Sequence, residues 1–224
     1  MSVLYLVRHG QASFHGDDYD VLSDVGREQA RVVGAALAAR AVTPGAIVSG
    51  GLQRHRETAR EACDAAGWTV SVDVDPDWDE IDHVDVIGAH HPAYRSHAAI
   101  VTGLADDSAP SFEGMWTDAL RRWVARDGVY AESHDDFQAR VARAALRAGS
   151  SVASGRPVVV FTSGGPVTAV TAAALGLDNL GWGQLDPVIA NASVTAFRAE
   201  GDGLRLLTFN EVGHLQSADV LTQL

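Results

Sequence analysis

Short apolar runs alternate with amphipathic stretches along the first part of the chain. Residues 3–7 form a continuous apolar run that ends in Arg-His-Gly, which predicts a buried central strand followed by a loop. Ser23 is a good N-cap for a helix whose inward stripe holds Val33 and Leu37, one turn apart. A second buried strand is predicted at 46–48, and a second helix at 52–66 that Gly67 ends.

Further predicted strands and helices follow later in the chain. Val70, Val72 and Val74 alternate with polar residues, which predicts a third strand with one polar face. The later predicted elements are a strand at 157–161, a helix at 167–175, and a hairpin of 193–200 and 204–210 around Gly201-Asp202-Gly203. The β-α-β-α-β order predicts a three-layer α/β/α sandwich with a mostly parallel central sheet.

Residues 81–135 interrupt this alternation of strands and helices. They carry His83, His90, His91 and His97, an Ala-Asp-Asp-Ser-Ala-Pro loop at 105–110 and a helical stretch around 115–126, and another predicted helix follows at 135–148. We therefore expect residues 1–224 to form a single domain with an insertion at about 81–135 that covers the active-site end.

Composition narrows the class of protein. The 224 residues are 46% hydrophobic and 21% charged, as in globular proteins. The net charge of −12 argues against binding nucleic acid by bulk attraction. No apolar run approaches the ~20 residues of a membrane span, and the apolar N-terminal run is too short for a signal peptide. We expect a cytoplasmic protein that binds no membrane, and a homodimer remains open.

The numbers of cysteine and lysine residues exclude several kinds of site. The single cysteine, Cys63, excludes an intrachain disulfide and a multi-cysteine metal site. All 17 basic residues are arginine, so a Schiff-base lysine and a P-loop are excluded as well.

Polar residues follow three of the predicted strands. The first strand ends in Arg8-His9-Gly10, the second opens a helix that carries Arg54, and the late strand ends in Ser163-Gly164-Gly165. The carboxyl ends of parallel strands form the ligand edge of such a sheet, and glycine-rich turns there offer N–H groups to anions. Because the planar arginine fork binds phosphate through two hydrogen bonds, these strand ends predict a phosphate pocket.

A histidine beside such a pocket suggests a nucleophile. Neutral imidazole is available near pH 7, and His9 can attack phosphorus to form a covalent phosphoryl-enzyme. The leaving oxygen then needs a proton, which Glu80 is placed to supply, with Asp79 and Asp82 as the nearest alternatives.

At this point the residues resemble a known family. The stretch Leu6-Val7-Arg8-His9-Gly10-Gln11 looks like the signature of the histidine phosphatase superfamily, the phosphoglycerate mutase-like proteins. Further stretches that are similar to family motifs lie at 22–30, 49–59, 79–82, 210 and 214–215. The resemblance implies the phosphoglycerate mutase-like fold and hydrolysis of a phosphorylated small molecule through a phosphohistidine.

The resemblance also implies a role for each matching residue. His9 is the nucleophile, Arg8 and Arg54 clamp the phosphoryl group, and Glu80 is the proton donor and later the base. Gln11, Ser163 and Gly164 complete the expected phosphate-binding set. No metal and no organic cofactor are expected.

This sequence departs from the family pattern at one position. The family usually ends its late strand in His-Gly-Gly, whereas this chain has Ser163, which can donate a hydrogen bond but supplies no positive charge. The alternative function is therefore a non-catalytic or weakly active phosphate-ligand-binding or regulatory member of the same fold. After Glu80, His83-Val84-Asp85 replaces a glycine-rich acidic pattern, which favours a phosphatase over a glycolytic mutase.

Other candidate residues carry weaker signals. His90, His91 and His97 lack the spacing of a zinc site. Ser163 does not lie in a Gly-x-Ser-x-Gly elbow, which argues against a serine hydrolase. His214 either packs in the core or approaches the pocket.

Overall fold

The computed structural model describes residues 3–13, 19–104, 111–152, 155–200, 203–215 and 220–222. The predicted loop at 105–110 and residues 201–202 of the predicted hairpin turn lie outside these ranges. The chain forms two compact units: Met1–Glu80 with Arg140–Leu224, and Ile81–Ala139.

The first unit is built on one mixed sheet. Its described strands are β1 (Val3–Arg8), β2 (Ala46–Ser49), β3 (Val72–Val74), β4 (Val158–Thr162), β5 (Val194–Glu200) and β6 (Gly203–Glu211), in the order β3-β2-β4-β1-β5-β6. The first four strands of that order are parallel to their neighbours, whereas β5 is antiparallel to β1, and β6 to β5. The mostly parallel sheet predicted from the sequence is confirmed.

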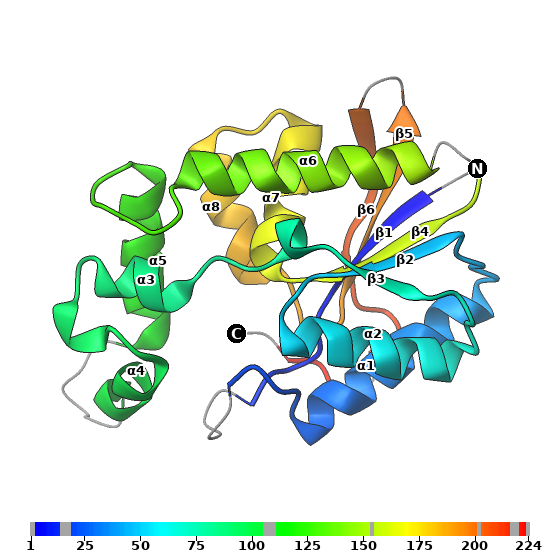
Figure 1. Ribbon diagram of the computed structural model, residues 1–224, viewed down its shortest axis with the longest axis horizontal. Helices are drawn as coiled ribbons and strands as arrows, with labels where there is room; N and C mark the ends of the chain where they lie inside the picture. The colour runs from blue at the N-terminus through cyan, green and yellow to red at the C-terminus, as the bar shows by residue number, and fades with distance from the viewer. Residues whose placement is uncertain are drawn as a thin grey trace. The chain divides into compact units, whose positions relative to one another are not determined.

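Helices cover both faces of this sheet (Figure 1). One face carries α1 (Asp24–Ala39) and α2 (Gln53–Ala66), and the other carries α7 (Gly164–Leu175) and the part of α6 (His134–Val152) that belongs to the first unit. The chain continues through η1 (Pro76–Trp78), α8 (Asn179–Leu185) and η3 (Asp186–Val188). A core of buried aliphatic and aromatic side chains, including Val33, Leu37, Ile47, Val159 and Phe161, holds α1 and α2 to the sheet. The predicted three-layer arrangement is confirmed.

Local signals in the sequence explain several boundaries. The Ser23 hydroxyl accepts a hydrogen bond from the Gly26 N–H and caps α1, as predicted. Gly67 ends α2 in the left-handed conformation, with φ of 66°. The third strand is shorter than predicted: Val70 lies outside it, and Val74 is 53% exposed. Val74 is exposed because β3 lies at the edge of the described sheet, where β2 is its neighbour.

The second unit contains short helices. They are α3 (His83–Gly88), η2 (Pro92–Tyr94), α4 (His97–Leu104), α5 (Phe112–Val124) and the first residues of α6. The buried Trp123 packs edge-on against His134 and Phe137, with ring centroids 5.0 and 5.5 Å away. That residues 81–135 cover the active-site end stays a prediction. Within the described ranges, no helix is long and apolar enough to cross a membrane.

Candidate active site

The carboxyl ends of β1, β2 and β4 lie next to one another. Arg8 pairs in register with Thr162, and Ser49 pairs with Phe161. The chain leaves β1 toward α1 on one face and leaves β4 toward α7 on the other, so the two connections diverge at this edge (Figure 1). In open α/β sheets, ligands bind at the strand ends where two connections diverge in this way.

His9 follows β1 and is held in one orientation. Its Nδ1 lies 2.7 Å from the Gly10 carbonyl oxygen. Since a carbonyl oxygen only accepts, Nδ1 carries the ring proton and Nε2 keeps its lone pair. Burial lowers the pKa of His9 well below its usual value, and the Arg54 and Arg8 guanidiniums lower it further. His9 is therefore neutral near pH 7 and carries its lone pair, the group that can attack phosphorus, on Nε2.

Two arginines contribute positive charge beside His9. The buried Arg8 donates through Nη1 to the Ile189 carbonyl oxygen. Arg54, in the first turn of α2, donates through its Nε to His9 Nε2 at 3.3 Å. Both residues are thus fixed by the fold before any ligand binds, which favours electrostatic stabilisation of a phosphoryl group.

Two residues of the loop before α1 hold Arg54. The Asp20 carboxylate lies 2.6 Å from Arg54 Nη1 and also accepts the Gln53 N–H at 2.7 Å. The ring of Tyr19 stacks on the guanidinium, with Cζ 5.2 Å from the ring centroid. Sequence reasoning missed both residues because they lie in a polar loop without periodicity.

Glu80 reaches the N-terminus of α7. One carboxylate oxygen accepts the Gly165 N–H at 3.2 Å. The backbone before it is fixed by Arg140 of α6, whose Nη1 donates to the carbonyl oxygens of Asp77 and Asp79 at 3.1 and 2.8 Å. Thr162 donates to the Trp78 carbonyl oxygen at 2.6 Å and ties the same segment to β4.

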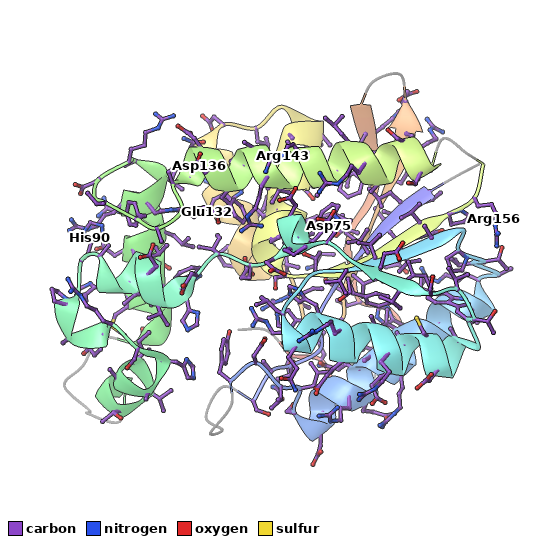
Figure 2. All side chains as sticks on the ribbon, viewed as in Figure 1. Asp75, His90, Glu132, Asp136, Arg143 and Arg156 are labelled. Atoms are coloured by element: carbon purple, nitrogen blue, oxygen red, sulfur yellow. The ribbon has the colours of Figure 1, made fainter. Side chains whose placement is uncertain are left out.

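Further arginines of α6 reinforce this segment. Arg147 contacts the carboxylates of Asp75 and Asp77, each at 2.7 Å, and Arg143 lies 3.5 Å from Asp77. Figure 2 labels Asp75 in the segment after β3 and Arg143 on α6. No pattern in the sequence indicated that α6 would position the Glu80 segment.

The two alternative acids have other partners. The Asp79 carboxylate accepts the N–H groups of Gly51 and Leu52 at the start of α2. Burial raises the pKa of Asp79, but its contacts with His55 and these N–H groups outweigh burial and lower it. Asp82 caps α3 by accepting the N–H groups of Val84 and Asp85. Glu80 is the carboxylate of the three that contacts the first turn of α7.

Ser163 is the N-cap residue of α7, and its hydroxyl meets a second histidine. Its Oγ lies 2.6 Å from Nε2 of His55, and both residues are fully buried. The His55 ring also lies beside the His9 ring, with centroids 5.6 Å apart. Sequence reasoning missed His55. The available signal was its place directly after Arg54 in a helix that begins at a strand end.

The remaining predicted ligands lie at the same edge. Gln11 accepts a hydrogen bond from the Ser23 hydroxyl at 2.8 Å, while its own N–H donates to Gln29. Gly164 is buried in the first turn of α7. His214 contacts the carbonyl oxygen of Ala192 at 2.8 Å.

A metal centre was not expected from the sequence. Within the part of the chain that the structure describes, no group of three or more His, Cys, Asp or Glu side chains is arranged to hold an ion. Independence of metals stays a prediction.

A family model and a curated relative both match most of this chain. A family model described as the histidine phosphatase superfamily (branch 1) matches residues 4–212. The chain is 31% identical over 219 residues to a glucosyl-3-phosphoglycerate phosphatase of Mycolicibacterium vanbaalenii, covering 89% of this chain and 87% of that protein.

Solved structures are similar over almost the whole chain. A mycobacterial glucosyl-3-phosphoglycerate phosphatase in complex with VO3 is 28% identical, with a TM-score of 0.66, covering 95% of this chain and 100% of that one. Bacillus stearothermophilus YhfR, at 21% identity, has a TM-score of 0.69, covers 96% and 100% of the two chains, and shares the fold. The predicted fold class is confirmed.

Proposed function

Because the chain belongs to the histidine phosphatase superfamily, we propose that it hydrolyses phosphomonoesters of small molecules through a phosphohistidine on His9. The membership confirms the predicted enzyme class, a histidine-type phosphatase. The observation that carries the assignment of His9 is its fixed ring: Nδ1 donates to Gly10, and Nε2 faces Arg54 at 3.3 Å.

The first step transfers the phosphoryl group to the enzyme. His9 Nε2 forms a bond to phosphorus while the ester P–O bond breaks, and Glu80 gives its proton to the leaving oxygen. In the second step a water molecule attacks phosphorus and transfers a proton to Glu80, and the Nε2–P bond breaks. Inorganic phosphate leaves, and both residues return to their starting states.

The phosphoryl oxygens are stabilised by groups around His9. Arg8 and Arg54 supply positive charge, and the first turn of α7 offers the positive end of a helix dipole. Ser163, Gly164 and Gln11 complete the phosphate-binding set. In this cycle Arg54 exchanges part of its contact with Asp20 for the substrate phosphate, because both anions compete for one guanidinium.

The substrate is a phosphorylated small molecule. The two relatives named as glucosyl-3-phosphoglycerate phosphatases make that ester the first compound to assay. A cytoplasmic location, a homodimer and independence of metals belong to the same proposal. Activity that survives excess chelator supports the last point, and activity restored only by an added cation contradicts it.

The decisive experiment follows the covalent intermediate. Incubation with a labile phosphoryl donor should label the wild type with an acid-labile, base-stable phosphate, and turnover of an aryl phosphate should accompany it. His9→Ala should lose label and turnover together, whereas His134→Ala, a buried histidine of the second unit, should keep both. Phosphate binding without turnover in the wild type would instead favour the regulatory alternative.

A further inference from the structure

His55 and Ser163 form a buried pair, and the reaction steps above give a role to Ser163 but none to His55. His55 is the third residue of α2, and Ser163 is the N-cap of α7. The 2.6 Å between His55 Nε2 and Ser163 Oγ is a short hydrogen bond, and neither side chain has exposed surface. The two polar groups come from separate helices and meet at the edge of the sheet where the parallel strands end. Their position there suggests a role in ligand binding.

The pair borders the place where the phosphoryl group is transferred. Ser163 directly follows Thr162, the register partner of Arg8, and the Thr162 carbonyl oxygen accepts the His9 N–H at 2.8 Å. The His55 ring lies 5.6 Å from the His9 ring, and its Nε2 contacts the Ser163 hydroxyl. Because Ser163 is the N-cap of α7, a phosphate group held between His9 and the first turn of α7 lies next to this residue.

Charged groups of both signs surround His55. The Asp79 carboxylate lies 3.7 Å from its Nδ1, too far for a hydrogen bond but near enough to act through charge. Burial lowers the pKa of His55, Asp79 raises it, Arg54 lowers it and Glu80 raises it. His9 faces it from β1. The imidazole is neutral in the empty site, and a nearby dianion opposes the effect of burial.

The neutral and protonated forms of His55 orient the hydroxyl differently. With its proton on Nδ1, facing Asp79, neutral His55 accepts the Ser163 O–H, which then turns away from the ligand. With protons on both nitrogens, His55 donates through Nε2 to the Ser163 oxygen. The hydroxyl proton is then free to point at a phosphate oxygen.

We propose that His55 and Ser163 form a relay in which His55 takes up a proton when a phosphate dianion binds, so that Ser163 donates its hydroxyl hydrogen to the phosphate. The proton comes from solvent and returns to it when phosphate leaves, and no covalent bond changes. Ser163 is the residue that touches the ligand, and His55 is a positioning residue that supplies positive charge from behind it. This inference rests on the proposed function of the site.

Sulfate binding as a function of pH tests the relay. Sulfate is a tetrahedral dianion that does not itself titrate near neutral pH, so pH dependence of its affinity reports on the protein. In the wild type, affinity should fall as pH rises from about 6 to 8, by up to about tenfold per pH unit for one linked proton. The contribution of His9 to the pH dependence of sulfate affinity is the same in the wild type and in every variant that retains His9.

Three variants separate the relay from packing. His55→Gln keeps a hydrogen-bonding side chain that cannot carry charge, and Ser163→Ala removes the hydroxyl. Both should flatten the pH dependence of sulfate affinity, whereas His134→Gln, at another buried histidine, should leave it as in the wild type. Unchanged slopes in His55→Gln, or an equal loss of affinity at every pH, would overturn the relay.

A measurement on the unmodified protein covers variants that fail to fold. Nitrogen-15 spectra of labelled histidine should show the Nε2 and Nδ1 signals of His55 moving to imidazolium positions when sulfate is added near pH 7. Signals that stay at neutral positions in the sulfate complex would contradict proton uptake.

Failure of the relay and failure of the proposed function give different results. If His9 becomes phosphorylated but neither sulfate affinity nor the His55 signals respond to pH as described, the phosphatase assignment stands without the relay. If the wild type shows neither label nor sulfate binding, both proposals are overturned together.

Discussion

Gly10 and Gly26 approach each other so closely that neither position has room for a side chain. A Cβ on Gly10 would collide with the carbonyl oxygen of Gly26, and a Cβ on Gly26 would collide with that of Gln11. The loop that carries His9 therefore lies directly on the first turn of α1. This contact, together with the hydrogen bond from the Gly10 N–H to Thr58, sets the position of the nucleophile.

Gly10→Ala should destabilise the protein and remove its activity. The added methyl meets backbone atoms, which cannot rotate away, so an overpacking cost of about 1–3 kcal/mol is expected. Urea unfolding measures the loss. Gly183→Ala is the control, since a Cβ there meets open space in α8, and it should be neutral or stabilise by up to about 1 kcal/mol. Equal stability of the two variants would contradict the role of the Gly10–Gly26 contact.

Arg54→Ala should lower kcat/KM by about 10²–10³, or roughly 2–4 kcal/mol, because a charge placed beside the developing phosphoryl transition state is removed. Steady-state kinetics with an aryl phosphate measure the loss. Arg56→Ala, two residues along the same helix and exposed, provides the matched control and should behave as the wild type. If both variants lose activity equally, general electrostatics rather than the Arg54 contact explains the effect.

Acidification should destabilise the fold below about pH 6.5 through its buried histidines. Burial lowers the pKa values of His9, His55, His134 and His214 in the folded state. At pH values well above about 6.5, the ordinary pKa of histidine, these residues are neutral in both states and add no pH dependence. As pH falls further, the unfolded chain binds protons that the folded chain does not, so stability falls by up to about 1.4 kcal/mol per pH unit for each histidine.

Unfolding midpoints in urea at about pH 7.5 and pH 5.5 measure this dependence. His9→Asn, whose amide can still donate to the Gly10 carbonyl oxygen, should show a smaller loss than the wild type. An identical loss in both proteins would mean that His9 is not held neutral by the fold.

Arg140→Gln should lower kcat more than it raises KM. Arg140 holds the carbonyl oxygens of Asp77 and Asp79, and its loss frees the segment that ends in Glu80. Hydrogen bonds from a charged donor contribute about 1.5–3 kcal/mol, so a measurable fall in the free energy of unfolding is also expected.

Arg143→Gln is the control for Arg140→Gln. It removes an ion pair of a 59% exposed arginine with Asp77, and such pairs contribute about 0–1 kcal/mol. A kcat that is insensitive to Arg140→Gln would show that Glu80 is positioned without α6.

Local sequence signals were sufficient for the architecture and for the residues next to strand ends. Strands and helices could be placed because hydrophobic period, caps and glycine stops act over a few residues, as at Ser23 and Gly67. His9, Arg8 and Arg54 could be singled out because the carboxyl ends of parallel strands share one edge whatever the loops do.

The sequence by itself determined the layers of the fold and the phosphate edge, while tertiary structure decided which side chains meet there. His55 and Ser163 are 108 positions apart, and Arg140 lies 61 positions from the Asp79 carbonyl that it holds. No local pattern encodes such pairs, because they depend on which strands become neighbours and on the direction in which each side chain leaves its helix. The exposure of Val74 depends on tertiary structure in the same way, since alternation describes a strand but does not say whether it lies at the sheet's edge.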